Sequence, residues 1–182
     1  MQSGVVDGGH CAIVLAEVED ARSIVETIER ASGRIFATVG MPEIAASEPV
    51  AVEVLDTYRM AGRAWVLVAE DAPSVGPVAF ALVDVLDGAA HVEQVSVDPA
   101  FARQGLGRRL LDHVAGDARR AGRTAVTLTT FRDVPWNAPY YERCEFRPLA
   151  EDELGPELRA KRDAETSHGL DPTRRVCMRR DL

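Results

Sequence analysis

The sequence predicts a mixed α/β fold in which helices flank a sheet. Short runs rich in β-branched and aromatic residues alternate with segments whose apolar residues recur at helical spacing. Two of the strand-like runs are separated by Asp87-Gly88, a dipeptide typical of tight hairpin turns. The chain has 182 residues, 46% of them hydrophobic, which is enough for one domain with a sizeable core. We therefore expect a single domain over residues 10–182, preceded by a glycine-rich, disordered stretch at 1–9.

The first half of the chain predicts a strand, two helices and three further strands. The first helix is expected to begin at Glu19-Asp20 and to end near Ala31. Ser47 as N-cap, with Pro49 in the first turn, predicts that the second helix begins there and runs to about Met60. The expected strands are residues 12–15, 65–69, 77–86 and 90–97.

The second half predicts a helix, a strand, a short helix and a last strand. Apolar residues at helical spacing predict the long helix over 105–121, and Gly122 ends it. The polar segment 150–172 is open to two interpretations, a helical flap over a site or a solvated excursion, and we favour the excursion. The remaining expected elements are a strand over 124–131, a short helix from Pro135 and a strand over 175–178.

Composition excludes several classes of protein. Cys11, Cys144 and Cys177 lack the spacing of metal ligands, so we expect free thiols in a reducing cytoplasm and no metal site. No apolar run reaches the ~20 residues of a membrane helix. The N-terminus has neither the basic start nor the apolar stretch of a secretion signal. These features predict a cytoplasmic protein without membrane partners.

The formal net charge of −8 is unevenly distributed. Residues 1–98 carry a net charge of −11, residues 99–123 of +4 and residues 124–182 of −1. A local basic island on an acidic protein suits a small phosphate-rich ligand, whereas a nucleic acid favours a broad basic face. Lys161 is the single lysine beside 20 arginines, and the simplest cause is a GC-rich genome.

The basic island contains the most informative segment, from Val95 to Leu111. A β-branched strand ends before Pro99, and a short Arg/Gln/Gly stretch then opens into the long helix. This order directs free backbone N–H groups and the positive end of a helix dipole at a ligand, for which a phosphate is well suited. A nucleotide triphosphate loop is excluded because the chain has no Gly-Lys pair. A dinucleotide loop is excluded because Leu110 stands where a third glycine is required.

The remaining pattern resembles the pyrophosphate loop of the GNAT superfamily, the acetyl-CoA-dependent N-acyltransferases. Gly105 and Gly107 match the glycines of that loop, while Ala102 replaces its leading Gln or Arg. The resemblance extends over about residues 76–148. It implies the GNAT fold, with a mainly antiparallel central sheet whose two middle strands splay apart to admit the cofactor.

A second motif supports the resemblance. Asn137–Phe146 looks like a shortened form of a later GNAT motif, in which Asn137, Tyr141 and Phe146 match. Glu145 stands where glycine usually ends the helix in a left-handed conformation, so either Glu145 is strained or the chain leaves the helix differently.

Acetyl transfer to an amine needs a base, an oxyanion donor and a proton for the leaving thiolate. His91 and Glu93 are both candidate bases on one face of their strand, and we favour Glu93. The resemblance implies that the N–H group of Val95 polarises the thioester and that Tyr141, with Tyr140 as its competitor, is the general acid. The expected cofactor-binding residues are Val95, Ser96, Val97, Ala102, Arg103, Gln104, Gly105, Leu106, Gly107, Arg108 and Asn137. The expected acceptor-selecting residues are Arg132, Asp133 and Trp136.

The resemblance therefore implies an N-acetyltransferase that uses acetyl-CoA as co-substrate and transfers the acetyl group by direct attack in a ternary complex. The alternative is a non-catalytic acyl-CoA-binding or regulatory domain on the same fold. The expected partner is a small-molecule or peptide amine acceptor, which the acidic first 98 residues would favour as a cation. A homodimer is left open.

Overall fold

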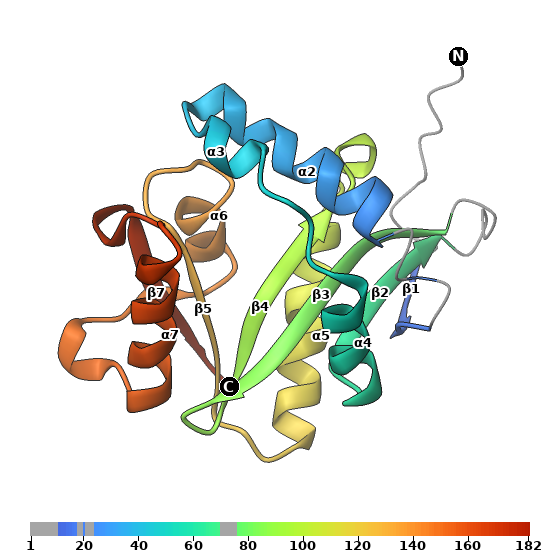
Figure 1. Cartoon of the computed structure of the whole chain (residues 1–182). Coiled ribbons are helices and arrows are strands. Elements are labelled where there is room, and N and C mark those ends of the chain that lie inside the picture. Colours follow the sequence, from blue (N-terminus) through green and yellow to red (C-terminus); the bar gives the residue numbers. More distant parts are fainter. Residues whose placement is uncertain (1–10, 18–19, 21–23, 70–75) are drawn as a thin grey trace. The chain divides into compact units, whose positions relative to one another are not determined.

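The structure is a computed structural model that describes residues 11–17, 20, 24–69 and 76–182 (Figure 1). Within these residues, seven strands form a sheet in the order β1-β2-β3-β4-β5-β7-β6. The pairings β1–β2, β2–β3, β5–β7 and β6–β7 are antiparallel, and β4–β5 is parallel. The expected mixed α/β fold with a mainly antiparallel sheet is confirmed. The expected disorder of residues 1–9 lies outside the described residues.

The secondary-structure elements follow most of the expected order. The strands are β1 (Cys11–Leu15), β2 (Ala64–Ala69), β3 (Pro77–Leu86), β4 (Ala89–Val97), β5 (Ala125–Phe131), β6 (Arg147–Pro148) and β7 (Arg175–Asp181). The α-helices are α2 (Arg30–Arg34), α3 (Pro42–Ala45), α4 (Val52–Met60), α5 (Leu106–Arg120), α6 (Ala138–Arg143) and α7 (Pro156–Ser167). The other helical turns are the π-helix η1 (Ile24–Glu29) and the 3₁₀ turns η2 (Ile35–Val39), η4 (Pro99–Phe101), η5 (Glu151–Glu153) and η6 (Pro172–Arg174).

The chain divides into two compact units. Unit 1 comprises the residues up to Leu82 together with Gln94–Leu110, and unit 2 comprises Val83–Glu93 together with Leu111–Leu182. Unit 1 has an apolar core in which helical residues pack on β2 and β3. The buried members of this core are Ala16, Ile24, Ile28, Leu55, Ala64, Val66, Phe80 and Leu82.

The helix that the sequence predicts to begin at Ser47 corresponds to α4, which begins later. Ser47 does not cap it, because the Ser47 hydroxyl donates a hydrogen bond to the carbonyl of Glu43 at 3.0 Å, at the end of α3. The backbone N–H of Val50 is held by both carboxylate oxygens of Glu29, each at 3.1 Å. This contact keeps the segment after Ser47 outside the helix, and α4 begins only at Val52, after an extended Ala51.

The hairpin turn between β3 and β4 contacts the start of α7 in unit 2. Asp87 and Gly88 have φ angles of 49° and 77°, both left-handed, as the tight turn predicted from this dipeptide requires. The Asp87 carboxylate accepts hydrogen bonds from the backbone N–H groups of Glu157 and Leu158, at 3.0 and 2.9 Å. It therefore caps the N-terminus of α7 from 70 residues away in sequence.

Residues 150–172 contain η5, α7 and the start of η6, and most of their side chains are exposed. The preferred interpretation as a solvated excursion is therefore correct about exposure, but it missed the helix. The apolar signal is weak because Leu158 is the buried residue of α7. It packs with Leu154 and Cys177 of β7. Gly155 leaves room for this cap, since a Cβ atom there would clash with the Asp87 carboxylate.

Candidate functional site

The predicted phosphate loop lies in unit 1 between β4 and α5. Its backbone is left-handed at Arg103 and Gly105, with φ angles of 64° and 76°. Asp98 fixes the start of the turn, because its carboxylate accepts a hydrogen bond from the Ala100 N–H at 2.9 Å. The first helical hydrogen bond runs from the N–H of Arg109 to the carbonyl of Gly105 at 3.1 Å. The N–H groups in the first turn of an α-helix have no intrahelical acceptor, so the start of α5 is where this loop could offer backbone donors to a ligand.

The side chains of this segment differ in exposure. Leu106 is only 2% exposed, so its backbone N–H is the group it can offer to a ligand. A Cβ atom at Gly105 would meet nothing within 4 Å, so packing does not exclude a side chain at this position. Glycine is favoured there because the φ angle is positive. Among the other expected cofactor-binding residues, Ala102, Arg103 and Arg108 are exposed, and Val95, Ser96, Val97, Gln104 and Gly107 are half-buried.

The second predicted motif lies in unit 2, on α6 and the turn after it. The Tyr141 ring packs edge-to-face against Phe146 and Tyr140, with ring centroids 5.9 and 5.5 Å away. Burial raises the pKa of Tyr141 above its usual range, the Cys144 thiol acts in the same direction and Arg175 opposes them. Tyr141 therefore keeps its proton at neutral pH and is able to act as a hydrogen-bond donor.

Glu145 keeps the left-handed conformation that the motif's glycine would provide. Its φ is 69°, and its carboxylate lies 2.9 Å from the guanidinium of Arg180. Arg180 also contacts Asp112 at 2.7 Å. The left-handed turn is thus present here with glutamate in place of glycine. Asn137 precedes α6, and its half-buried side chain makes no capping hydrogen bond.

The two candidate bases on β4 lie in very different environments. His91 is 1% exposed, and its Nδ1 atom lies 3.0 Å from the Thr127 hydroxyl. Burial lowers the pKa of His91 to about 4, Lys161 and Arg175 lower it as well, and Asp84 opposes them. His91 is therefore neutral at pH 7 and a much weaker base than an exposed histidine.

Glu93 forms an ion pair with Lys161 of α7. The Lys161 Nζ atom lies 2.6 Å from Oε1 and 2.5 Å from Oε2 of Glu93, and both side chains are 28% exposed. Sequence reasoning missed this partner because it treated the α7 segment as solvated. The signal that was available is that Lys161 is the single lysine of the chain.

The parallel ladder between β4 and β5 is short. Its register covers Ala90–Val92 against Val126–Leu128, although both strands continue beyond it. Glu93 is thus the first residue of β4 past the ladder. The residues expected to select an acceptor follow β5, where Arg132 donates to the Arg175 carbonyl at 3.2 Å and Asp133 lies 3.3 Å from Arg174. Trp136 is half-buried in the same loop.

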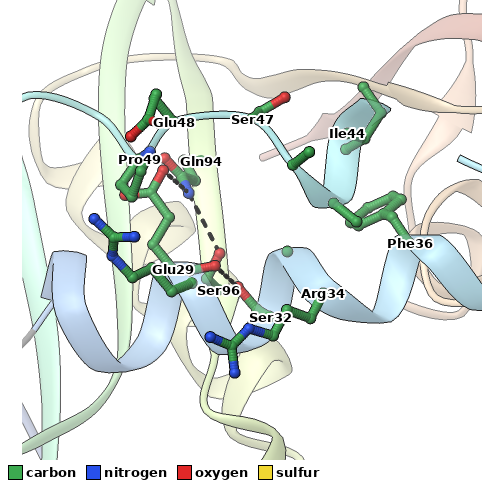
Figure 2. A pocket seen from close by; sticks show the side chains of 14 residues that line it. Glu29, Ser32, Arg34, Phe36, Ile44, Ser47, Glu48, Pro49, Gln94 and Ser96 are labelled. Carbon is green, nitrogen blue, oxygen red and sulfur yellow. Dashed lines mark hydrogen bonds between the residues drawn. The ribbon is translucent and has the colours of Figure 1, made fainter. Parts of the chain in front are cut away.

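Unit 1 contains a pocket of about 410 Å³ that sequence reasoning did not identify. Glu29, Gln94 and Ser96 face one another in it (Figure 2). The Gln94 amide lies 3.3 Å from the Glu29 carboxylate and 3.5 Å from the Ser96 hydroxyl. Charges of both signs line the pocket: Glu29 and Glu48 are acidic, and Arg30 and Arg34 are basic. Its walls are residues of η1, α2, η2 and α3, the segment after α3, and β4.

The predicted site residues are divided between the two units. Val95–Val97 and Ala102–Arg108 belong to unit 1, whereas His91, Glu93 and Asn137–Tyr141 belong to unit 2. In the part of the chain that the structure describes, no helix is long and apolar enough to span a membrane. The same residues include no group of three His, Cys, Asp or Glu side chains suited to hold a metal ion.

Comparison with known proteins identifies the family. The family model described as "Acetyltransferase (GNAT) family" matches residues 32–146. N-acetylglutamate synthase from Neisseria gonorrhoeae, solved with coenzyme A and N-acetyl-glutamate, is 17% identical with a TM-score of 0.67. The match covers 96% of this chain but only 35% of that one, so this chain spans about a third of its length.

Two smaller acetyltransferases match over nearly their whole lengths. PaiA N-acetyltransferase from Thermoplasma acidophilum, solved with coenzyme A, is 12% identical with a TM-score of 0.63, and the match covers 94% of this chain and 99% of that one. The ribosomal-protein-S18-alanine N-acetyltransferase from Escherichia coli is 19% identical with a TM-score of 0.61, and 94% of each chain is covered. The structural matches show the same fold, and the family model spans more than half of the sequence. The chain belongs to the GNAT family of acetyltransferases.

Proposed function

We propose that the protein is an acetyl-CoA-dependent N-acetyltransferase. The observation that carries the proposal is the loop Asp98–Gly105, whose left-handed Arg103 and Gly105 lead into the N-terminus of α5. The N-terminus of α5 carries the positive end of a helix dipole, which suits a pyrophosphate, and it lies in the chain's basic island. Solved members of the fold contain coenzyme A, which supports the same ligand here.

Acetyl-CoA would supply a thioester that is ready for aminolysis. The expected loop residues, from Ala102 to Arg108, would bind its phosphates through backbone amides and arginine side chains. The half-buried Val95–Val97 backbone and the Asn137 amide would bind the arm, and the Val95 N–H would donate a hydrogen bond to the carbonyl.

Proton transfer is assigned to Glu93 and Tyr141. The deep burial of His91 and its lowered pKa disfavour it as the base, which supports Glu93 for removing the proton from the acceptor amine. Tyr141, with a raised pKa, would give its proton to the departing thiolate. Tyr140 packs on Tyr141 but takes no separate role in this proposal.

A specific observation favours the non-catalytic alternative: the carboxylate of Glu93 is held by an internal ammonium group. A thiol-release assay with acetyl-CoA and a panel of amines, antibiotics and peptides separates the two functions. Release above the hydrolysis background, lost in Glu93→Gln and retained in His91→Gln, supports the catalytic proposal. Tight acetyl-CoA binding without any amine-dependent release would replace it by the non-catalytic function.

The acceptor is proposed to be a small-molecule or peptide amine, in a cytoplasmic setting. The free, buried thiols of Cys144 and Cys177 agree with a reducing compartment. If the acidic first 98 residues attract a cationic acceptor, kcat/KM for that acceptor should fall steeply with ionic strength. A flat salt response with a neutral or anionic best acceptor would exclude this steering.

Arg132, Asp133 and Trp136 are proposed to select the acceptor. A homodimer is left open, and sedimentation of the full chain would test it.

A further inference from the structure

The helix α7, which carries Lys161, is held by contacts at both of its ends. At the N-terminus of the helix, Asp87 accepts hydrogen bonds from the amides of Glu157 and Leu158. Near the C-terminus, Glu165 forms an ion pair with Arg175 at 3.0 Å, in which the two side chains are only 14% and 11% exposed. The helix therefore presents Lys161 to Glu93 as part of the packed structure of unit 2.

The contact places an amine where the proposed base would need one. A general base must lie about 2.6–3.2 Å from the group whose proton it removes. The Lys161 Nζ atom satisfies this condition toward Glu93 Oε1, at 2.6 Å. With respect to Glu93, the lysine thus has the position of an acceptor amine. It is also the only side-chain amine of the chain.

We propose that Lys161 is a self-acetylation site of this protein. The proposal rests on the proposed acetyltransferase activity and on Glu93 as its base. Nζ would attack the carbonyl carbon of acetyl-CoA, forming an N–C bond while the C–S bond breaks. Of the two protons that the ammonium loses, one passes to Glu93 and on to water, and the other ends on the released thiol of coenzyme A.

The modification would change the electrostatics around Glu93. An acetylated lysine is a neutral amide and no longer forms an ion pair with the carboxylate. The positive charge of Lys161 is also one of the causes that lower the pKa of His91 to about 4. Burial, the largest cause, remains after acetylation or the Lys161→Gln substitution, so either change should raise the pKa of His91 only part of the way from about 4, and Lys161→Arg should leave it low.

The test is peptide mapping by mass spectrometry of the folded full chain after incubation with acetyl-CoA alone. We expect one acetyl group on Lys161, formed at a rate per molecule that does not depend on protein concentration. Glu93→Gln should slow the modification by about 10²-fold or more, the lower range for general-base catalysis. Lys161→Arg, whose guanidinium keeps the charge, should acquire no acetyl group at this position.

Three outcomes would overturn the inference. Amine-dependent thiol release without any acetyl group on Lys161 would reject self-acetylation and leave the proposed function standing. Equal modification of the folded wild type, Glu93→Gln and urea-unfolded chain would mean simple chemical acetylation by the thioester. The absence of both thiol release and modification would reject the proposed function together with the inference. The His91 titration in Lys161→Gln and Lys161→Arg, followed by nuclear magnetic resonance, independently checks that the charge of Lys161 acts on His91.

Discussion

Acidification should destabilise this protein through His91. The pKa of His91 is lowered from 6.5 to about 4, mainly because its ring is 1% exposed. Above pH 6.5 the imidazole is neutral in both the folded and the unfolded chain. Between pH 6.5 and 4 the unfolded chain binds a proton that the folded chain does not. The free energy of unfolding therefore falls as the pH is lowered through this window.

The size of the effect follows from the shift. One pKa unit corresponds to 1.36 kcal/mol, so this histidine should remove about 3 kcal/mol of stability between pH 7 and pH 4. Other groups titrate in the same range, and a matched variant is needed to subtract them. His91→Asn suits this purpose because its amide can still reach the Thr127 hydroxyl, which lies 3.0 Å from Nδ1 in the wild type.

Urea unfolding at several pH values measures the prediction. The wild type should lose about 3 kcal/mol more than His91→Asn over this range, with most of the difference appearing below pH 6. Parallel pH dependences for the two proteins would refute the reasoning. So would a His91 resonance, assigned by its absence from the variant, that titrates near the value of an exposed histidine.

Three further predictions concern single residues. Tyr141→Phe should lower kcat by about 10²–10⁴-fold with little change in acetyl-CoA affinity, and a loss of affinity by calorimetry at unchanged kcat would make it a packing residue. Gly105→Ala, in the loop before α5, should destabilise by about 1–2 kcal/mol because the φ of Gly105 is +76°. Gly116→Ala is the matched control inside α5; its Cβ would lie 3.5 Å from Arg120, and it should stabilise by up to about 1 kcal/mol in urea unfolding. Gly155→Ala should displace the Asp87 carboxylate and destabilise by about 1–2 kcal/mol, and combining it with Asp87→Ala should add little; full additivity would show that the two residues act separately.

The sequence was most informative where local chemistry determines the structure. The Asp87-Gly88 turn, the long helix that ends before Gly122 and the β-branched strand that became β5 all depend on short-range conformational preferences. The start of α4 was misplaced because a contact from 21 residues away decides it, the bond between the Val50 N–H and Glu29. Helix propensity at Ser47 cannot report such a contact.

The same limit applies to the candidate site. Alternation along β4 identified both His91 and Glu93 as candidate bases, but it could not decide between them. The structure distinguishes them by the burial of His91 and by the contact of Glu93 with Lys161, which is 68 residues away in sequence. The contact between Gln94 and Glu29 in the pocket likewise joins two residues that lie 65 positions apart in sequence. Pairings of this kind arise from the tertiary fold and leave no periodic pattern to detect.

The cap that Asp87 places on α7 has a consequence for how the protein folds and opens. A helix of 12 residues is barely stable alone in water, and α7 has few buried residues to compensate. We expect its formation to follow closure of the β3–β4 hairpin, which brings the capping carboxylate into place. The α7 amides should accordingly exchange their hydrogens faster than those of β5 and β7, through openings smaller than global unfolding. In each such opening Lys161 separates from Glu93, so helix opening is one route by which that carboxylate is released from its internal partner.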